Sequence, residues 1–321
     1  MNYIYSSNGT SWSIGGIPGG PYGRMSFCNG TFFATGDTGA IATSTDGINW
    51  SNIQTLGTSP NVLGEVVWAP VLGLFVLNQY STDVGAYFTG QWTSPTGATW
   101  TVTTTDPLNQ GGQNAYREPK AGLGLVGMGT TVGGVYSGTN IYSTTLVPPW
   151  STNGGASGYL VFGGTRFVSF YANNSNGAWY STDGMNWSAG VNVGSNGYAS
   201  YAGYLLGNFV GCLYGIGGSG GIVSPDIVYS PDGATWSSAK SPYWPTYTQC
   251  EWVGGADNGT LALLVGGTNI PNIAATSTNL SSWSTTPLPA IGTGYTGIAY
   301  GAGLFLAVTP IPNPNPIVML L

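Results

Sequence analysis

The chain has 321 residues, only 5% of them charged, and its formal net charge is −6 without a single histidine. With only 5 lysines and arginines, the sequence excludes proteins that neutralise rows of nucleic-acid phosphates or dock electrostatically on anionic membranes. The lack of histidine also excludes imidazole-based nucleophile systems and metal clusters of His and Cys.

The remaining composition predicts a folded, strand-rich protein. Apolar residues make up 42% of the chain, with 12 Trp, 20 Tyr and 10 Phe, and the 54 Gly are spread along it. Such a mixture favours strands and tight turns over helices. Cys28, Cys212 and Cys250 are odd in number and widely spaced, which predicts reduced, buried thiols rather than disulfides or a metal site. No basic-apolar leader and no long apolar span is seen, so neither a signal peptide nor membrane insertion is expected.

A short motif recurs along the chain. It begins with Ser, in most copies carries Asp or Asn and then Gly, and ends in Trp; its copies cover residues 6–12, 44–50, 94–100, 181–187, 230–236 and 277–283, with Thr96 as a weaker turn residue in the third and Leu280 in place of Gly in the last. A degenerate copy, one residue longer, covers residues 143–150. An Asp or Asn carboxyl or amide oxygen can accept bonds from the N–H groups just ahead of it, and Gly adopts the positive φ of a tight turn. The predicted turn-forming residues are Asn8, Asp46, Asp183, Asp232 and Asn279.

A second pattern lies between the motifs: two short apolar strands joined by a Gly-containing turn, as at residues 25–34 and 66–77. Each repeat therefore predicts four strands, two in the apolar pair and two flanking the motif turn. The motif Trp residues are 37 to 50 residues apart. Four-stranded repeats of that length are typical of a β-propeller. We therefore predict an all-β fold, a seven-bladed β-propeller of four-stranded blades.

The two ends of the chain complete each other in this scheme. Residues 2–6 predict a third strand, and residues 295–309 predict a first and a second strand, so one blade closes the ring from both termini. A single domain is expected over residues 1–309. Residues 310–321 form a Pro-rich arm with an apolar end, which we expect to pack on the ring's edge or on a partner, including another copy of the chain.

The motif resembles the Asp-box, or BNR, repeat of sialidase-like propellers. The match is Ser-Thr-Asp-Gly-x-Asn-Trp at residues 44–50 and 181–187, although Gly follows Asp directly, which departs from the commoner spacing. The resemblance implies that these aspartates are structural turns set away from any active site.

The same resemblance would place three arginines on a substrate carboxylate, beside a Tyr/Glu pair and an Asp. The chain has Arg24, Arg117 and Arg166, but the Arg-Ile-Pro signature of that family is missing. Ion pairing of Arg24 with Glu65, and of Glu118 with Arg117 or Lys120, is the structural alternative. No catalytic residue is therefore assigned. No cofactor is expected either; Ca²⁺ alone stays open, because Asp, Asn and carbonyl oxygens suffice to bind it.

Length variation falls on the propeller face opposite the motif turns, where insertions are often used for binding. These segments carry aromatic and amide or carboxylate side chains suited to sugars or to a protein partner. The predicted ligand-binding residues are Tyr80, Asp83, Tyr136, Asn173, Asn174, Tyr243, Trp244 and Tyr247.

Two functions follow from these observations. The first is a non-enzymatic binding or structural propeller, virion-associated or extracellular, that contacts glycans or neighbouring subunits. The chain's low charge and its richness in Gly, Ser, Thr and Asn resemble the composition of phage tail-fibre and decoration proteins, which need no signal peptide. The alternative is a glycan-active hydrolase on a sialidase-like propeller.

Overall fold

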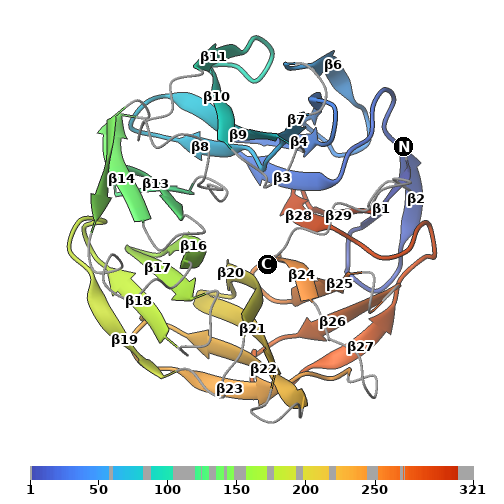
Figure 1. Cartoon of the computed structure of the whole chain (residues 1–321). Helices are drawn as coiled ribbons and strands as arrows, with labels where there is room; N and C mark the ends of the chain where they lie inside the picture. The colour runs from blue at the N-terminus through green and yellow to red at the C-terminus, as the bar shows by residue number, and fades with distance from the viewer. Residues whose placement is uncertain are drawn as a thin grey trace.

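The computed structural model is built of β-strands arranged in sheets around a central axis (Figure 1). It describes residues 2–57, 61–81, 88–103, 120–123, 125–129, 135–140, 143–147, 157–171, 177–192, 198–216, 222–243, 252–267, 270 and 272–309. The β-propeller architecture predicted from the repeats is confirmed.

Six sheets have four strands each. Three of them comprise β3 (Arg24–Cys28), β4 (Thr31–Thr35), β5 (Ala40–Ser44) and β6 (Ser51–Thr55); β12 (Lys120–Gly122), β13 (Leu125–Gly129), β14 (Val135–Asn140) and β15 (Ser143–Val147); and β16 (Ser157–Gly163), β17 (Arg166–Tyr171), β18 (Gly177–Ser181) and β19 (Ser188–Asn192).

The other three four-stranded sheets lie further along the chain. They comprise β20 (Tyr198–Leu205), β21 (Asn208–Ile216), β22 (Ile222–Ser230) and β23 (Ser237–Lys240); β24 (Trp252–Asp257), β25 (Ala262–Gly266), β26 (Ile273–Ser277) and β27 (Ser284–Pro287); and β28 (Gly297–Gly301), β29 (Leu304–Val308), β1 (Asn2–Ser6) and β2 (Ser13–Gly16).

The remaining sheet is different. It has five strands, β7 (Asn61–Leu63), β8 (Val67–Ala69), β9 (Leu74–Ser81), β10 (Phe88–Ser94) and β11 (Thr101–Thr103). Both β7 and β8 pair with β9, along different stretches of it. The prediction of seven four-stranded blades is therefore wrong: in the described part of the chain there are six such blades, and the fifth strand breaks the expected repeat.

The segment between β7 and β8 is bonded both to β9, where the Gly64 N–H donates to the Asn78 carbonyl over 2.9 Å, and to the neighbouring sheet. The Thr35 hydroxyl donates to the Gly64 carbonyl over 2.6 Å, and the Ser26 hydroxyl accepts from the Val66 N–H over 3.2 Å. The Cys28 thiol donates to the Val66 carbonyl over 3.6 Å. Side chains of β3 and β4 thus satisfy backbone groups of the segment that separates β7 from β8.

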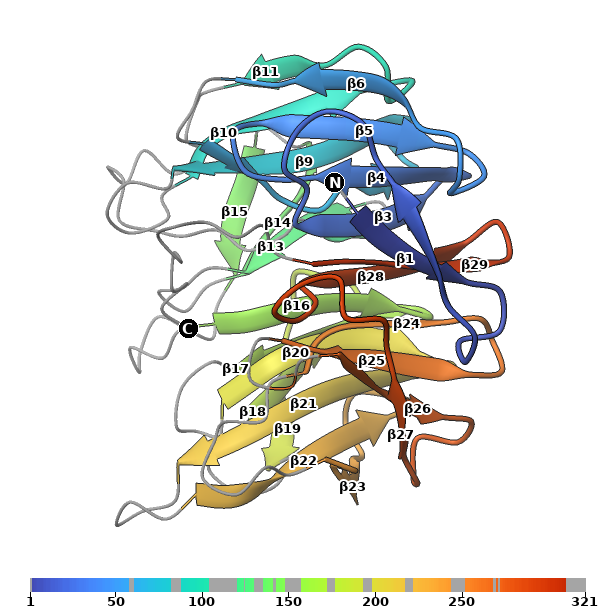
Figure 2. The ribbon, with the colours of Figure 1, turned by 90° about the vertical axis from the view of Figure 1, so that its right-hand side faces the viewer.

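The innermost strands form a closed circuit in which β28, β3, β8, β12, β16, β20 and β24 are each packed against the next, and β24 against β28 (Figure 1). One sheet is assembled from both ends of the chain, because β1 pairs with β29, Tyr3 lying opposite Val308. The predicted closure by terminal strands is confirmed. In Figure 2, β1 and β29 lie side by side although they are far apart in sequence.

The motif turns share one hydrogen-bond pattern. In the turn after β18, the Ser181 hydroxyl accepts from the Gly184 N–H over 2.8 Å. One Asp183 carboxylate oxygen accepts from the Met185 and Asn186 N–H groups over 2.9 and 2.7 Å. Asn8, Asp46, Asp232 and Asn279 accept the corresponding pairs of N–H groups in their own turns.

Among the described residues, the turns at Gly9, Gly47, Gly97 and Gly233 also pack on the sheet before them. A Cβ added to Gly233 (φ +73°) would lie 2.5 Å from a Val168 methyl group of β17, and one added to Gly97 (φ +78°) would lie 3.0 Å from the Phe33 ring of β4. Gly47 and Gly9 approach Leu306 and Leu263 in the same way. In the turn after β26, Leu280 takes the glycine position with φ +63° and is only 1% exposed, so burial in the preceding sheet offsets its backbone strain.

The degenerate copy of the motif does not form such a turn. Residues 143–147 are strand β15, paired with β14 from Asn140 opposite Ser143 onward. The expected turn over residues 143–150 is therefore wrong, because Ser143 already belongs to the fourth strand of its sheet.

Several expectations concern residues outside the described ranges or at their edge. The arm predicted for residues 310–321 lies outside them, as does Cys250. Of the two described cysteines, Cys212 is buried and Cys28 is half-buried. Burial raises the pKa of the Cys28 thiol to about 12, so it stays protonated at neutral pH.

A pair of glycine variants separates backbone strain from contact between sheets. Gly233 and Gly207 have φ +73° and +76°, but a Cβ on Gly207 would meet nothing within 4 Å. Gly207→Ala should lower the free energy of unfolding by about 1–2 kcal/mol, because a Cβ at positive φ is strained. Gly233→Ala should lower it by about 1–3 kcal/mol more, because its Cβ also overpacks against Val168. Urea denaturation of both variants is the measurement. Equal losses would show that the turn does not press on Val168.

The turn carboxylates predict acid sensitivity. The backbone N–H and the side-chain amide of Asn186 lower the pKa of Asp183 to about 2, and donors in their own turns also lower the pKa values of Asp46 and Asp232. An Asp whose pKa is lowered in the folded protein contributes its full stabilisation at any pH above its ordinary pKa of about 3.9. That contribution is lost as the pH falls through the folded value.

Asp183→Asn should therefore keep its turn at pH 7, as Asn8 and Asn279 keep theirs, and lose less stability on acidification. Urea midpoints at pH 7 and about pH 2.5 measure this difference. If the variant and the wild-type protein lose the same amount, the Asp183 turn does not contribute to the acid response.

Candidate functional site

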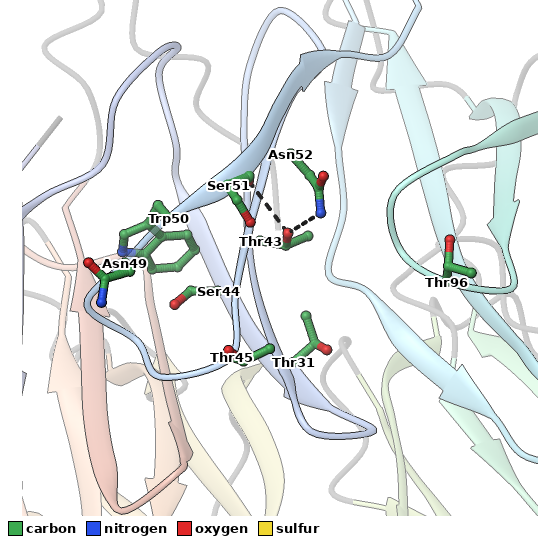
Figure 3. Close-up of a pocket in the computed structure, with 9 residues that line it drawn as sticks. All are labelled: Thr31, Thr43, Ser44, Thr45, Asn49, Trp50, Ser51, Asn52 and Thr96. Carbon is green, nitrogen blue, oxygen red and sulfur yellow. Dashed lines mark hydrogen bonds between the residues drawn. The ribbon is translucent and has the colours of Figure 1, made fainter.

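A pocket of about 340 Å³ lies between the sheet β3–β6 and the motif turn of the next sheet (Figure 3). Its volume is at the lower end of the range of small-molecule sites. The lining comes from the β3–β4 hairpin, the end of β5, the motif turn after it, the start of β6 and the facing turn. These residues are Thr31, Thr43, Ser44, Thr45, Asn49, Trp50, Ser51, Asn52 and Thr96.

The floor of the pocket is held by hydrogen bonds between β5 and β6. Asn52 Nδ2 donates to the Thr43 hydroxyl over 2.9 Å, and that hydroxyl donates to the Ser51 carbonyl over 3.4 Å. The strand register shifts between Ile41 and Thr43, and Asn52 has φ +48°. Asn tolerates this backbone conformation better than most residues, so the shift sets the position of the Asn52 amide beside Thr43 (Figure 3).

The two walls of the pocket are fixed to each other. Gln54 Nε2 on β6 donates to the Ala98 carbonyl of the facing turn over 2.8 Å. On the other side, the Trp50 ring meets the Tyr3 ring edge to face, with centroids 5.9 Å apart. Trp50 is therefore held in one orientation at the border of the pocket by a residue of the closing sheet.

The chemistry of the lining is neutral and polar. None of the nine residues is ionisable near neutral pH, and the nearby Asp46 carboxylate is already bonded to the Ile48 and Asn49 N–H groups and to Asn49 Nδ2. The hydroxyl and amide groups can donate and accept hydrogen bonds, and the indole adds an apolar surface. Such a lining can bind an uncharged polar molecule, but it supplies no general acid or base.

An equivalent interface elsewhere in the ring is filled. Arg166, like Thr31, begins the second strand of its sheet, and Tyr180, like Thr43, immediately precedes the motif Ser. Arg166 Nη1 donates to the Asp232 carbonyl of the next turn over 2.7 Å and lies 5.7 Å from the centroid of the Tyr180 ring. Where Arg and Tyr fill that interface, Thr31 and Thr43 leave space, and this difference accounts for the pocket.

Two predicted ligand-binding residues lie in strands rather than loops. Tyr80 is in β9, paired with Val62 and Phe88, and only 8% exposed. The prediction that it lies in an exposed loop is wrong, because β9 continues to Ser81 by pairing with both β7 and β10. Tyr136 is in β14 opposite Met128 and Leu146, so its predicted loop position is wrong for the same reason.

Tyr243 is partly buried and packs against a core cluster that includes Trp252. The Ser241 hydroxyl donates to the Tyr243 carbonyl over 3.0 Å and accepts from Trp252 Nε1 over 3.1 Å. The other predicted ligand-binding residues, Asp83, Asn173, Asn174, Trp244 and Tyr247, lie outside the described residues, so their role stays a prediction.

The arginines considered for a sialidase-type site are placed apart where they are described. Arg24 starts β3 at the end remote from the β3–β4 hairpin, whereas Arg166 directly follows the β16–β17 hairpin. These positions are at opposite ends of their hairpins, and Arg117 lies outside the described residues. Glu65 forms an ion pair with Lys120, with Oε2 and Nζ 3.3 Å apart.

Searches for other kinds of site add two findings about the described residues. No group of three or more His, Cys, Asp or Glu side chains is placed to hold a metal ion among them. Among the same residues, no helix has the length and apolar character needed to cross a membrane.

Comparison with known proteins places the chain by its fold. No family model and no curated protein matches the sequence. Among solved structures, virginiamycin B lyase from Staphylococcus aureus is similar with a TM-score of 0.65 and 12% identity, covering 91% of this chain and 95% of that one. YCF48 bound to D1 peptide is similar with a TM-score of 0.60 and 15% identity, covering 95% and 100%.

A third similar structure is the Cps50 (Swd1) β-propeller domain of Myceliophteria thermophila, with a TM-score of 0.60 and 6% identity, covering 91% of this chain and 97% of that one. At such identities the likeness concerns the fold alone. The neighbours include both an enzyme and propellers that are not described as enzymes.

Sequence reasoning missed the pocket residues, although a signal was present. The residue before the motif Ser is Tyr at positions 5, 180 and 229 but Thr at 43, 93 and 276. Aligning the repeats would have marked this alternation of large and small side chains. It could not have shown that Thr31 and Thr96 meet Thr43, since these residues come from different strands and sheets.

A reciprocal exchange tests the origin of the pocket. Thr43→Tyr should change the free energy of unfolding by less than about 1 kcal/mol, because Tyr5, Tyr180 and Tyr229 occupy the equivalent position and a filled interface gains apolar contact. Tyr180→Thr should lose about 1–2 kcal/mol, because Arg166 loses its ring contact. Urea denaturation measures both. A larger loss for Thr43→Tyr than for Tyr180→Thr would contradict the equivalence.

Proposed function

We propose that this protein is a non-catalytic binding propeller that recognises its partner through the pocket between the sheet β3–β6 and the following motif turn. The observation that carries the proposal is the neutral polar lining of that pocket by Thr, Ser, Asn and Trp side chains. Such side chains position and bind a ligand, whereas turnover would need an acid, base or activated nucleophile beside it.

The similar structures support binding rather than turnover. One of them is YCF48 with D1 peptide bound, so this fold presents a peptide-binding surface there. For the lyase, a variant with one histidine replaced by alanine is described as catalytically inactive. Our chain contains no histidine, so it lacks the residue type on which that activity depends.

The partner we propose is a glycan or a neighbouring subunit at a virion or cell surface. The support is compositional: 5% charged residues, a net charge of −6 and abundant Gly, Ser, Thr and Asn. A surface of this kind presents many hydroxyl and amide groups and few cations, which suits uncharged partners over nucleic acid.

The test uses the full chain on arrays of neutral oligosaccharides, acidic oligosaccharides and peptides. Wild-type protein should bind at least one class, and Thr43→Tyr should weaken that binding by about tenfold or more by filling the pocket. Thr276→Tyr is the matched control, because Thr276 precedes a motif Ser in another sheet and donates to the Ser284 carbonyl over 3.4 Å, as Thr43 does to Ser51.

Mass spectrometry of the bound compounds, and liquid chromatography with fragment-ion analysis of quinupristin incubated with the protein, should show no conversion, including none to a ring-opened isomer of the same mass. Binding that Thr43→Tyr leaves intact would refute the assignment of this pocket. Conversion of any glycoside, or of quinupristin, by the wild-type protein would refute the non-catalytic reading.

A further inference from the structure

We infer that the pocket binds a neutral sugar residue of a glycan. This inference rests on the proposed function and assigns the class of ligand that the pocket binds. The argument starts from what the lining cannot satisfy. An anionic ligand finds no Arg or Lys among the nine lining residues and meets a protein of net charge −6. A cationic ligand finds no lining carboxylate, and Asp46 already accepts four hydrogen bonds in its own turn.

A purely apolar ligand is also a poor match. It would cover hydroxyl and amide groups without replacing their hydrogen bonds to water, and each buried unsatisfied group carries a free-energy penalty of about 1–3 kcal/mol. The lining therefore selects a ligand that is uncharged and has many hydrogen-bonding groups. Figure 3 shows the Trp50 ring on the side of β5 and β6 away from Asn52 and Thr96, where it packs on Tyr3, so the selection rests on the hydroxyl and amide groups.

A pyranose meets these requirements together. Its hydroxyls both donate and accept, as do the Thr31 and Thr96 hydroxyls. One Asn52 Nδ2 hydrogen is used by Thr43, so the amide can still offer its other N–H and its oxygen to a ligand. Because this amide is held by Thr43 and Trp50 by Tyr3, little ordering is needed on binding.

The size and opening of the pocket suit one residue of a longer chain. About 340 Å³ is small for a binding site, whereas Thr45, Ser51, Asn52 and Thr96 on its border are exposed. A sugar chain can therefore continue outward from the occupied residue. At the equivalent interface the Arg166 and Tyr180 side chains occupy this space, so the fold does not require the space to be empty.

The experiment uses saturation-transfer NMR and titration with defined probes on the intact chain. Neutral probes are the methyl glycosides of glucose, galactose, mannose and N-acetylglucosamine with their disaccharides; comparison probes are glucuronate, sialic acid and a Gly-Ser-Asn peptide. At least one neutral probe should bind saturably, and the charged sugars should bind about tenfold more weakly or worse.

Three variants locate the binding. Thr43→Tyr should abolish the neutral-sugar signal, and Thr276→Tyr should keep it. Asn52→Asp keeps the shape and tolerates the positive φ but replaces the amide donor with a carboxylate, so it should weaken sugar binding by about tenfold.

The outcomes separate the two proposals. If the peptide or a charged sugar binds in a manner that Thr43→Tyr abolishes, and no neutral sugar does, the sugar assignment is overturned while the binding pocket stands. If no probe and no array compound responds to Thr43→Tyr, both are overturned. Neutral-sugar binding that persists in Thr43→Tyr overturns the location.

Discussion

The contact on which the whole ring depends is the one between each motif turn and the sheet before it. The turn closes on itself through Ser and Asp or Asn oxygens, which places its fourth residue at a positive φ and against the neighbouring sheet. Gly233 on Val168, Gly97 on Phe33 and Gly47 on Leu306 repeat this contact around the ring. A turn that looks local in sequence therefore also joins consecutive sheets.

The side chains next to these glycine contacts differ from one interface to another. Next to the contact lie three positions, at the start of the second strand, before the motif Ser and in the next turn. Arg166 and Tyr180 fill them in one interface, and threonines leave them open in another. A protein whose stability comes from the shared contact can vary the adjacent side chains, since the turns still hold the sheets together.

The pocket also depends on ring closure. Trp50 borders the pocket and packs edge to face on Tyr3, whose hydroxyl donates to the Gly47 carbonyl over 2.8 Å. Tyr3 lies in β1, in the sheet that joins both ends of the chain. The orientation of one wall is thus coupled to the pairing of the terminal strands, which links the stability of the ring to the geometry of the site.

The sequence by itself determined the strands and the turns, because these depend on local chemistry. Asp183 and Gly184 specify a turn wherever they stand, and alternating apolar segments specify strands. Periodicity then implied a ring, and the complementary halves at residues 2–6 and 295–309 implied its closure. Local chemistry failed where a neighbour decided the outcome: the additional strand β7 was not predicted, and Tyr80 lies buried in β9, which pairs with both β7 and β10.

Only the tertiary structure decided where a ligand can bind. Thr31, Thr43 and Thr96 are separated in sequence, and although an alignment of the repeats marks Thr43 as a small side chain, nothing in the sequence shows that the three residues meet. Their significance arises from packing, because the space appears where small side chains of two sheets face each other across a fixed gap. Strands and turns follow from neighbours along the chain, whereas a pocket follows from neighbours in space.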